Sequence, residues 1–150
     1  MGSKWEVTVF GNAPLEIIDG DRGNKYPKLN DFQQSGYCLF LNAGNVTCNG
    51  FDFSHCSFIS HSKDTALRKG KLQRNDIVLT TRGTVGNVAF FDGSVPYEHI
   101  RINSGMVIIR AQYQKIRPRF LYMFLKSNLL RSQIESLRTG SAQPQLPIRD

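Results

Sequence analysis

Two short runs of aliphatic and β-branched residues, 76–81 and 85–91, flank a turn with the sequence Thr-Arg-Gly-Thr. Strand-forming residues on both sides of a glycine-containing turn predict a β-hairpin. Its tip would present the guanidinium of Arg82 and the hydroxyls of Thr81 and Thr84. None of these side chains commonly acts as a general acid or base, so the hairpin is better suited to recognition than to catalysis.

The rest of the chain repeats this pattern of short apolar runs separated by polar turns. Further strands are predicted at 15–18, 37–42 and 102–111, and the last of these is apolar enough to be buried on both faces. Because the runs are close together and no helical crossover separates them, the sheet should be curled and largely antiparallel. The 150 residues are enough for one hydrophobic core, so the predicted fold is a single α+β domain.

The strongest helical pattern lies near the C-terminus. Pro118 suits the first position of a helix, and Thr139 and Gly140 suit its end, which predicts a helix over about 118–138. Apolar residues cover nearly every side of its first turns, so we expect that half to be buried. Other helices should be few and short, such as one over 63–69.

The formal net charge of +7 is unevenly distributed along the chain. Residues 1–60 carry four Lys or Arg against six Asp or Glu, whereas residues 61–150 carry fifteen against six. Asymmetry of this size within one domain is typical of a face that binds a polyanion. A basic protein whose charged face is merely solvated has the same composition, so charge alone leaves both interpretations open.

Membrane and metal-binding classes are disfavoured. The longest apolar runs are about six residues, far short of the roughly 20 that span a bilayer, so no membrane association is expected. Cys38, Cys48 and Cys56 are an odd set without a C-x-x-C pair, which predicts reduced thiols and a cytoplasmic protein. Their spacing from His55 and His61 matches no zinc pattern, so no metal site is predicted.

The sequence contains no recognisable catalytic motif. It lacks G-x-S-x-G, H-E-x-x-H and the Walker pattern, and each of its three histidines is more typical of a structural residue than of a base. Gly83 and Gly86 form a short G-x-x-G without the extended glycine pattern and following helix that hold a pyrophosphate. This G-x-x-G follows a strand, whereas the backbone-clamping G-x-x-G of KH domains joins helices. We therefore predict no catalytic residue and no cofactor.

Side chains able to contact DNA gather in the predicted turns. Arginine commonly reads guanine, asparagine and glutamine read adenine, and basic or hydroxyl side chains hold phosphates. The candidate DNA-binding residues are Arg22, Lys25, Tyr26, Lys28, Asn42, Asn45, Thr81, Arg82, Thr84, Ser141 and Gln143. Each alone is also typical of a solvated turn, but their recurrence at several strand ends favours a nucleic-acid interface.

Several segments, taken together, resemble a known protein family. The first two are Trp-Glu-Val at 5–7 with Ile-Ile-Asp-Gly-Asp-Arg-Gly-Asn-Lys-Tyr-Pro-Lys at 17–28, and Gly-x-Leu-x-x-Asn-Asp-Ile-Val-Leu-Thr-Thr-Arg-Gly-Thr-Val-Gly at 70–86. The others are Ile-Asn-Ser-Gly-Met-Val-Ile-Ile-Arg at 102–110, the helix start at 118–127, and Thr-Gly-Ser-Ala-Gln-Pro at 139–144. In this order, over nearly the whole chain, they resemble a target recognition domain of the specificity subunit of Type I restriction-modification systems.

The resemblance implies a non-catalytic module that recognises double-stranded DNA sequence-specifically. In this family two such domains, joined by long helices, each read one half of a bipartite target and dock modification (methyltransferase) and restriction subunits. Residues 1–150 correspond to one such domain without the spacer helix, which predicts a fragment or half-subunit. A hairpin pattern shared across the family indicates scaffold, so specificity is expected from Arg82 and the loops between 20 and 61.

Two alternatives remain open at the level of the sequence. The first is the same kind of domain within a single-chain restriction-methylation enzyme, in which modification and cleavage domains would precede it. The second is a small module that binds RNA or another protein. The first differs only in what lies upstream of Trp5, whereas the second differs in the ligand that the basic loops would bind.

Overall fold

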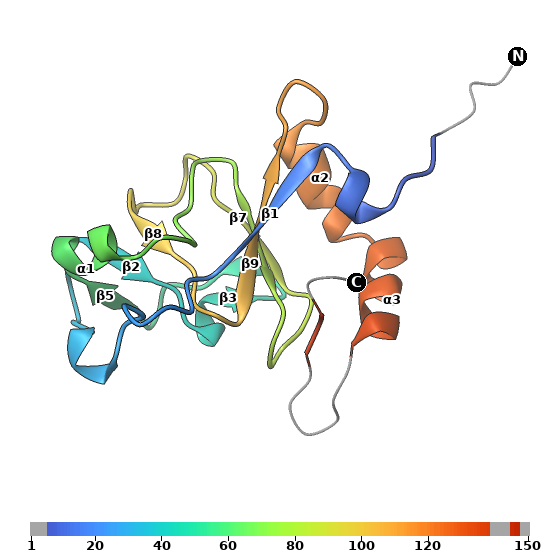
Figure 1. The fold of residues 1–150 in the computed structure, drawn as a ribbon. Helices are drawn as coiled ribbons and strands as arrows, with labels where there is room; N and C mark the ends of the chain where they lie inside the picture. Colours follow the sequence, from blue (N-terminus) through green and yellow to red (C-terminus); the bar gives the residue numbers. More distant parts are fainter. Residues whose placement is uncertain (1–5, 139–144, 148–150) are drawn as a thin grey trace, which may run out of the picture.

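A four-stranded antiparallel sheet forms the centre of the domain. The computed structural model describes residues 6–138 and 145–147. The strand order is β1 (Leu15–Asp19), β9 (Met106–Ala111), β6 (Ile77–Thr80) and β7 (Val88–Phe90). β6 and β7 form the predicted hairpin, and the strand predicted at the end of the 102–111 segment is the central β9 (Figure 1).

Two smaller sheets complete the β structure. One has the order β5 (Ser57–Ile59), β2 (Cys38–Phe40) and β8 (Ile100–Arg101), and the other pairs β3 (Val46–Thr47) with β4 (Gly50–Phe51). Among these described strands, only β2 and β8 pair in parallel. The predicted α+β class with largely antiparallel pairing is therefore confirmed.

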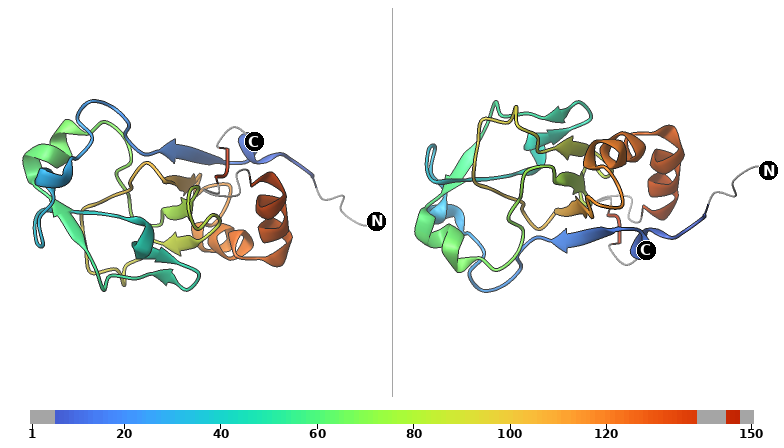
Figure 2. Two further views of the ribbon diagram at one scale, coloured as in Figure 1. Left: turned by 90° about the horizontal axis from the view of Figure 1, so that it is seen from below. Right: turned by 90° about the horizontal axis from the view of Figure 1, so that it is seen from above.

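Helices lie at the two ends of the domain. α1 (His61–Ala66) lies at one end, and α2 (Pro118–Leu125) and α3 (Asn128–Leu137) lie at the other (Figures 1 and 2). Short 3-10 turns are formed by η1 (Phe10–Asn12), η2 (Leu29–Asp31) and η3 (Ala43–Asn45).

The central strands β6 and β9 are buried on both faces. Val78 and Ile108 belong to a core that they share with residues of the smaller sheets, such as Leu39. Ile77 and Ile109 belong to a second core on the opposite face, which α2 and α3 cover. Burial on both faces explains why these strands read as continuous apolar runs rather than as alternating patterns.

The single helix predicted over 118–138 is instead two helices. The chain leaves the first helix at Lys126, and the Ser127 hydroxyl accepts a hydrogen bond from the N–H of Leu130, 3.5 Å away, which caps the second helix. Serine competes well for such a capping position, and this local preference ends the apparent continuity of the pattern. Ser127 is thus the N-cap of α3, which begins there as a separate helix.

The prediction that the first half of this helical segment is buried on nearly all sides is wrong. Leu121 and Leu125 are buried, but Phe120 and Met123 are 63% and 58% exposed. Only one face of α2 has the sheet beneath it, so apolar residues on its other face remain open to solvent. The described part of the domain therefore carries an exposed apolar surface on α2.

A buried charge network connects α1 to β8. The Asp64 carboxylate accepts hydrogen bonds from Arg101 and Lys71, and the Arg101 guanidinium also donates to the carbonyls of Leu67 and Lys69 at 3.2 and 2.8 Å. Burial raises the pKa of Asp64, but these hydrogen bonds and charges outweigh it and hold the pKa below its usual range. The network anchors the backbone of residues 67–69 against the sheet.

Candidate nucleic-acid interface

A loop at 19–28 carries four of the candidate residues, and a buried carboxylate holds it in shape. Asp21 is buried, and its two oxygens accept hydrogen bonds from the N–H groups of Arg68 and Gly23, each at 2.7 Å. These backbone hydrogen bonds, that of Arg68 first, hold the pKa of Asp21 below its usual range against the opposing effect of burial. The carboxylate thereby turns the loop outward and leaves Arg22 and Lys25 exposed.

The side chains of this loop differ in how much they are engaged by the protein itself. Arg22 pairs with Asp19 at 3.2 Å and donates to the carbonyl of Ser104 at 3.4 Å, while remaining 43% exposed. Tyr26 is half-buried, with its ring edge-on to Phe40 and its hydroxyl accepting a hydrogen bond from the N–H of Ser104 at 3.3 Å. Tyr26 therefore anchors the loop.

The other cations of the loop are exposed. Lys25 and Lys28 form no ion pair with any residue that the structure describes. Lysine side chains without a carboxylate partner carry a full positive charge into the solvent, which suits contact with a phosphate. These two residues are accordingly the free charges of the loop.

The hairpin tip presents Arg82 and Thr84 to solvent. Thr81 is buried, and its N–H donates to the Gly105 carbonyl at 2.8 Å, as does that of Arg82 at 3.3 Å. Gly83 lies at the tip with a φ of 73°, a left-handed conformation that favours glycine. Within the described part of the chain, the Arg82 guanidinium has neither a hydrogen-bond partner nor an ion-pair partner.

A turn at 103–105, between β8 and β9, joins the loop to the hairpin tip. Ser104 contacts Arg22 and Tyr26, and the next residue, Gly105, accepts hydrogen bonds from the backbone of the hairpin tip. Two candidate segments about sixty residues apart in sequence thus meet on one turn. Sequence reasoning did not single out this turn as part of a site. Its Asn-Ser-Gly sequence is a turn signal, but not a binding signal.

The C-terminal segment approaches the same place. The N–H of Leu146 donates to the Thr81 carbonyl at 2.7 Å, and Gln145 forms an isolated bridge with Arg82. Ser141 and Gln143, the remaining candidates of this region, lie outside the described residues. Their role as DNA contacts therefore stays a prediction.

Asn42 and Asn45 lie elsewhere and are engaged by the backbone. Asn42 accepts a hydrogen bond from the N–H of Gly44 at 2.9 Å and caps η3. Asn45 is 1% exposed, and its amide donates to the carbonyls of Asp52 and His55 at 2.8 and 2.9 Å. Asn45 consequently holds the 42–55 turn together, and the described contacts do not connect it to the surface around Arg82.

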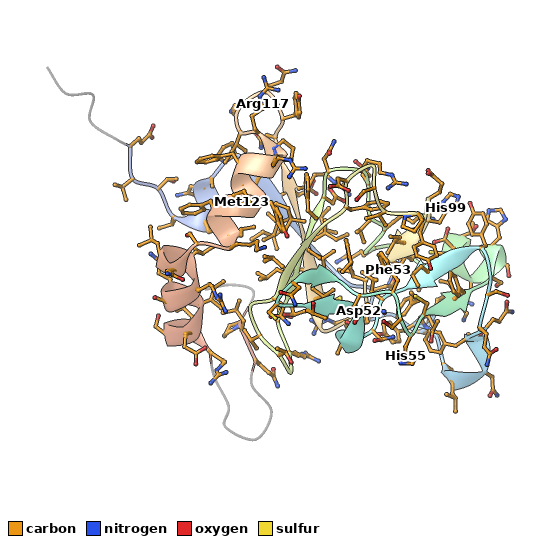
Figure 3. The ribbon with its side chains drawn as sticks, turned by 180° about the vertical axis from the view of Figure 1, so that it is seen from behind. Asp52, Phe53, His55, His99, Arg117 and Met123 are labelled. Carbon is orange, nitrogen blue, oxygen red and sulfur yellow. The ribbon has the colours of Figure 1, made fainter. Side chains whose placement is uncertain are left out.

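Some of the positive charges of residues 61–150 are paired inside the domain, and others lie at its surface. Arg101 and Arg110 are paired with aspartates inside it. Arg117 lies at the α2 end, far from His99 beside β8 (Figure 3). A count along the sequence does not register which cations are paired inside the domain, so the basic face suggested by the charge count stays a prediction.

The described residues contain neither a helix that could span a membrane nor a cluster of metal-binding side chains. Among the residues that the structure describes, no helix has the length and apolar character needed to cross a bilayer. Within residues 6–138 and 145–147, no three His, Cys, Asp or Glu side chains are grouped so that they could hold a metal ion.

Comparison with known proteins identifies the class. A family model described as the Type I restriction modification DNA specificity domain matches residues 15–149. The chain belongs to this family, and the resemblance of its motifs is thereby confirmed. Specificity for a DNA target is the role by which the family is defined.

Particular relatives agree with this assignment. The chain is 26% identical over 112 residues to the Type I restriction enzyme EcoBI specificity subunit of Escherichia coli, a match that covers 73% of this chain and 22% of that protein. The S subunit from M. genitalium has a similar fold, with a TM-score of 0.56 at 14% identity over 96% of this chain and 34% of that one. The HsdS subunit from Thermoanaerobacter tengcongensis has a TM-score of 0.57 at 15% identity over 90% and 31% of the two chains. The chain thus matches between about a fifth and a third of each relative.

The close packing of Gly20 against the 103–105 turn gives a direct test of this geometry. A Cβ added at Gly20 would lie 2.4 Å from the carbonyl oxygen of Asn103, so Gly20→Ala should lower the free energy of unfolding by about 1 to 3 kcal/mol. Gly11→Ala is the matched control, because an added Cβ there meets nothing within 4 Å. Urea unfolding of both variants measures the difference, and equal stability of the two would contradict the packing described.

Proposed function

We propose that this chain recognises one half of a bipartite target in double-stranded DNA for a Type I restriction-modification complex. The observation that carries the proposal is the turn at 103–105, which brings the Arg22 loop and the Arg82 hairpin tip onto one surface. That surface is bordered by cations without carboxylate partners among the described residues. In this proposal the domain acts in the cytoplasm and contributes no catalytic group, metal or cofactor.

The candidate residues divide into two roles within this proposal. Arg82 has the free guanidinium that bidentate recognition of guanine needs, and Thr84 is exposed on the same tip. Lys25 and Lys28 hold phosphates, and Arg22 joins them when DNA competes with Asp19. Thr81 and Tyr26 support these contacts by holding the hairpin tip and the loop to the 103–105 turn, whereas Asn42 and Asn45 hold the separate 42–55 turn. Ser141 and Gln143 are proposed as further contacts because residues 145 and 146 pair with the hairpin tip.

The family match favours duplex DNA over the alternatives considered from the sequence. Target recognition in Type I systems concerns DNA, and the match covers residues 15–149 rather than one short motif. An RNA-binding or protein-interaction module is not favoured by this match. The recognition domain of a single-chain restriction-methylation enzyme would bind DNA in the same way, and it is likewise not favoured.

The proposal includes association with modification (methyltransferase) and restriction subunits. One of the similar structures belongs to a study of complex assembly in a type I R-M system. The exposed apolar residues of α2 and α3 support a docking role, because contiguous apolar patches on soluble domains commonly mark interaction surfaces. The most exposed of them are Phe120, Met123 and Leu129. Figure 3 shows Met123 on α2, away from the end that carries His99.

Replacement of Arg82 tests the recognition surface. We expect Arg82→Ala to weaken binding to the preferred duplex by about 1 to 3 kcal/mol, or roughly 5- to 150-fold in Kd. The melting temperature should not change, because the described structure gives the guanidinium no partner. Fluorescence anisotropy with the duplex selected from a random pool measures the affinity.

Lys115→Ala is the matched control for Arg82→Ala, because Lys115 is also exposed but lies beyond the Ala111 end of β9, whereas the 103–105 turn beside Arg82 adjoins the Met106 end. It removes the same charge and should leave affinity nearly unchanged. Equal loss in the two variants would mean that binding depends on net charge alone and would remove Arg82 from the proposed interface.

Replacement of Phe120 tests the docking surface. We expect Phe120→Ser to reduce co-purification of this chain with the modification subunit of its own system while leaving duplex affinity unchanged, because it removes apolar contact area at the helical end only. Leu29→Ser is the control, since Leu29 is 87% exposed on η2 at the opposite end. Undiminished co-purification of the Phe120→Ser variant would place the docking surface elsewhere.

A further inference from the structure

The connection between α1 and β6 passes beside the loop at 19–28, although the two are about forty residues apart in sequence. The N–H of Arg68 donates to Asp21, and a Cβ added at Gly23 would lie 3.0 Å from Nη2 of Arg68. The Arg68 guanidinium therefore lies over the backbone of Gly23, next to Arg22.

Hydrogen bonds from Arg101 and Ile102 hold the backbone of this connection. The carbonyls of Leu67 and Lys69 accept hydrogen bonds from Arg101, and the Gly70 carbonyl accepts one from the N–H of Ile102 at 2.9 Å. Because the main chain is anchored to β8 and to the residue that follows it, the side chains of Arg68 and Lys69 are directed to the outside, where both are exposed. A rigid backbone with two adjacent exposed cations is a preorganised anion-binding arrangement.

Neither cation is neutralised by the described part of the protein. Arg68 and Lys69 take part in no ion pair there, whereas Arg22 is paired with Asp19. Asp21 lies close enough for the charge of Arg68 to contribute to its lowered pKa, but its oxygens accept hydrogen bonds from backbone N–H groups and form no ion pair with Arg68. Adjacent cations without a counter-charge repel one another, and a polyanion bound across them relieves that repulsion.

We propose that Arg68 and Lys69 contact the phosphate backbone of the same duplex that the Arg82 surface reads, and we call residues 67–70 the phosphate arm. Asp21 is then the positioning residue that holds the phosphate arm against the loop at 19–28. This inference rests on the proposed function and extends the interface to a segment without any nucleic-acid motif in its sequence. Through its two hydrogen bonds, Asp21 ties the backbone on either side of Arg22 to the backbone of Arg68. A phosphate contact adds affinity without sequence preference, so the arm sets the register in which Arg82 meets its base.

The salt dependence of DNA binding tests the two cations. Each phosphate contact contributes about 0.9 to the slope of log K against log salt concentration. Arg68→Gln and Lys69→Gln should each reduce the magnitude of the slope by about 0.9 and leave the preferred base sequence unchanged. Arg68→Lys should retain the slope, because it keeps the charge, and Lys115→Gln is the control in which no change is expected.

Asp21→Asn tests the positioning role. The amide has one acceptor oxygen in place of two, so one of the two N–H groups loses its partner. We expect the slope to fall as it does in Arg68→Gln, and the double variant Asp21→Asn with Arg68→Gln to show no further fall. A lower melting temperature with an unchanged slope would show that Asp21 only stabilises the fold, and would overturn its positioning role.

The outcomes separate this inference from the proposed function. If the unmodified chain binds duplex DNA and Arg82→Ala weakens it, but Arg68→Gln and Lys69→Gln leave the slope unchanged, the phosphate arm is wrong and the recognition surface stands. If the unmodified chain shows no affinity for duplex DNA of any sequence, the proposed function fails and the phosphate arm fails with it.

Discussion

Burial of β6 and β9 on both faces is the constraint on which the rest of the structure depends. Their side chains alternate between two separate cores, so a shift of one residue in the pairing would exchange the two sets of apolar residues. The last pair in this ladder is Thr80 with Met106. Directly beyond it lie the hairpin tip on one strand and the 103–105 turn on the other. The register of the core therefore determines how the hairpin tip and the 103–105 turn, which form the proposed recognition surface, are brought together.

Polar side chains then convert this rigid frame into a surface with free charges. The buried carboxylates of Asp21, Asp64 and Asp76 are each taken up by backbone N–H groups or by buried cations. Because these carboxylates are engaged inside, they do not neutralise the cations at the edge of the loops. Buried pairs of this kind contribute little net stability compared with apolar packing, but they determine where the backbone of each loop lies.

Part of this arrangement could be predicted from the sequence, and part could not. The hairpin and the doubly buried β9 follow from local patterns of β-branched residues, which the structure retains. The break at Ser127 was missed because an apolar pattern that continues across a capping residue looks like one helix. Exposure of Phe120 was missed because it depends on which neighbour covers α2, and periodicity does not encode that. Asn45 was predicted as a DNA contact from its residue type, yet a turn seven residues away engages its amide.

The way in which distant segments meet around the candidate residues could also not be predicted from local sequence patterns. Arg68 and Ser104 come to lie beside the loop at 19–28 only because β8, β9 and that loop pack together, and no spacing in the sequence marks that proximity. The exposure of Arg82 could be predicted because an arginine at a glycine-containing hairpin tip is exposed by local geometry alone. Residues whose role depends on tertiary contacts need the fold, whereas residues at the tips of local structures can be found from the sequence.

Mapping of backbone amide chemical shifts during titration with the selected duplex tests the central claim most directly. The account predicts that the perturbed amides cluster at 22–28, 82–84 and 103–105, with smaller changes at α2 and α3. Perturbations concentrated at 118–137, with the hairpin tip unchanged, would contradict the claim that the loop and the hairpin together form the DNA-reading surface.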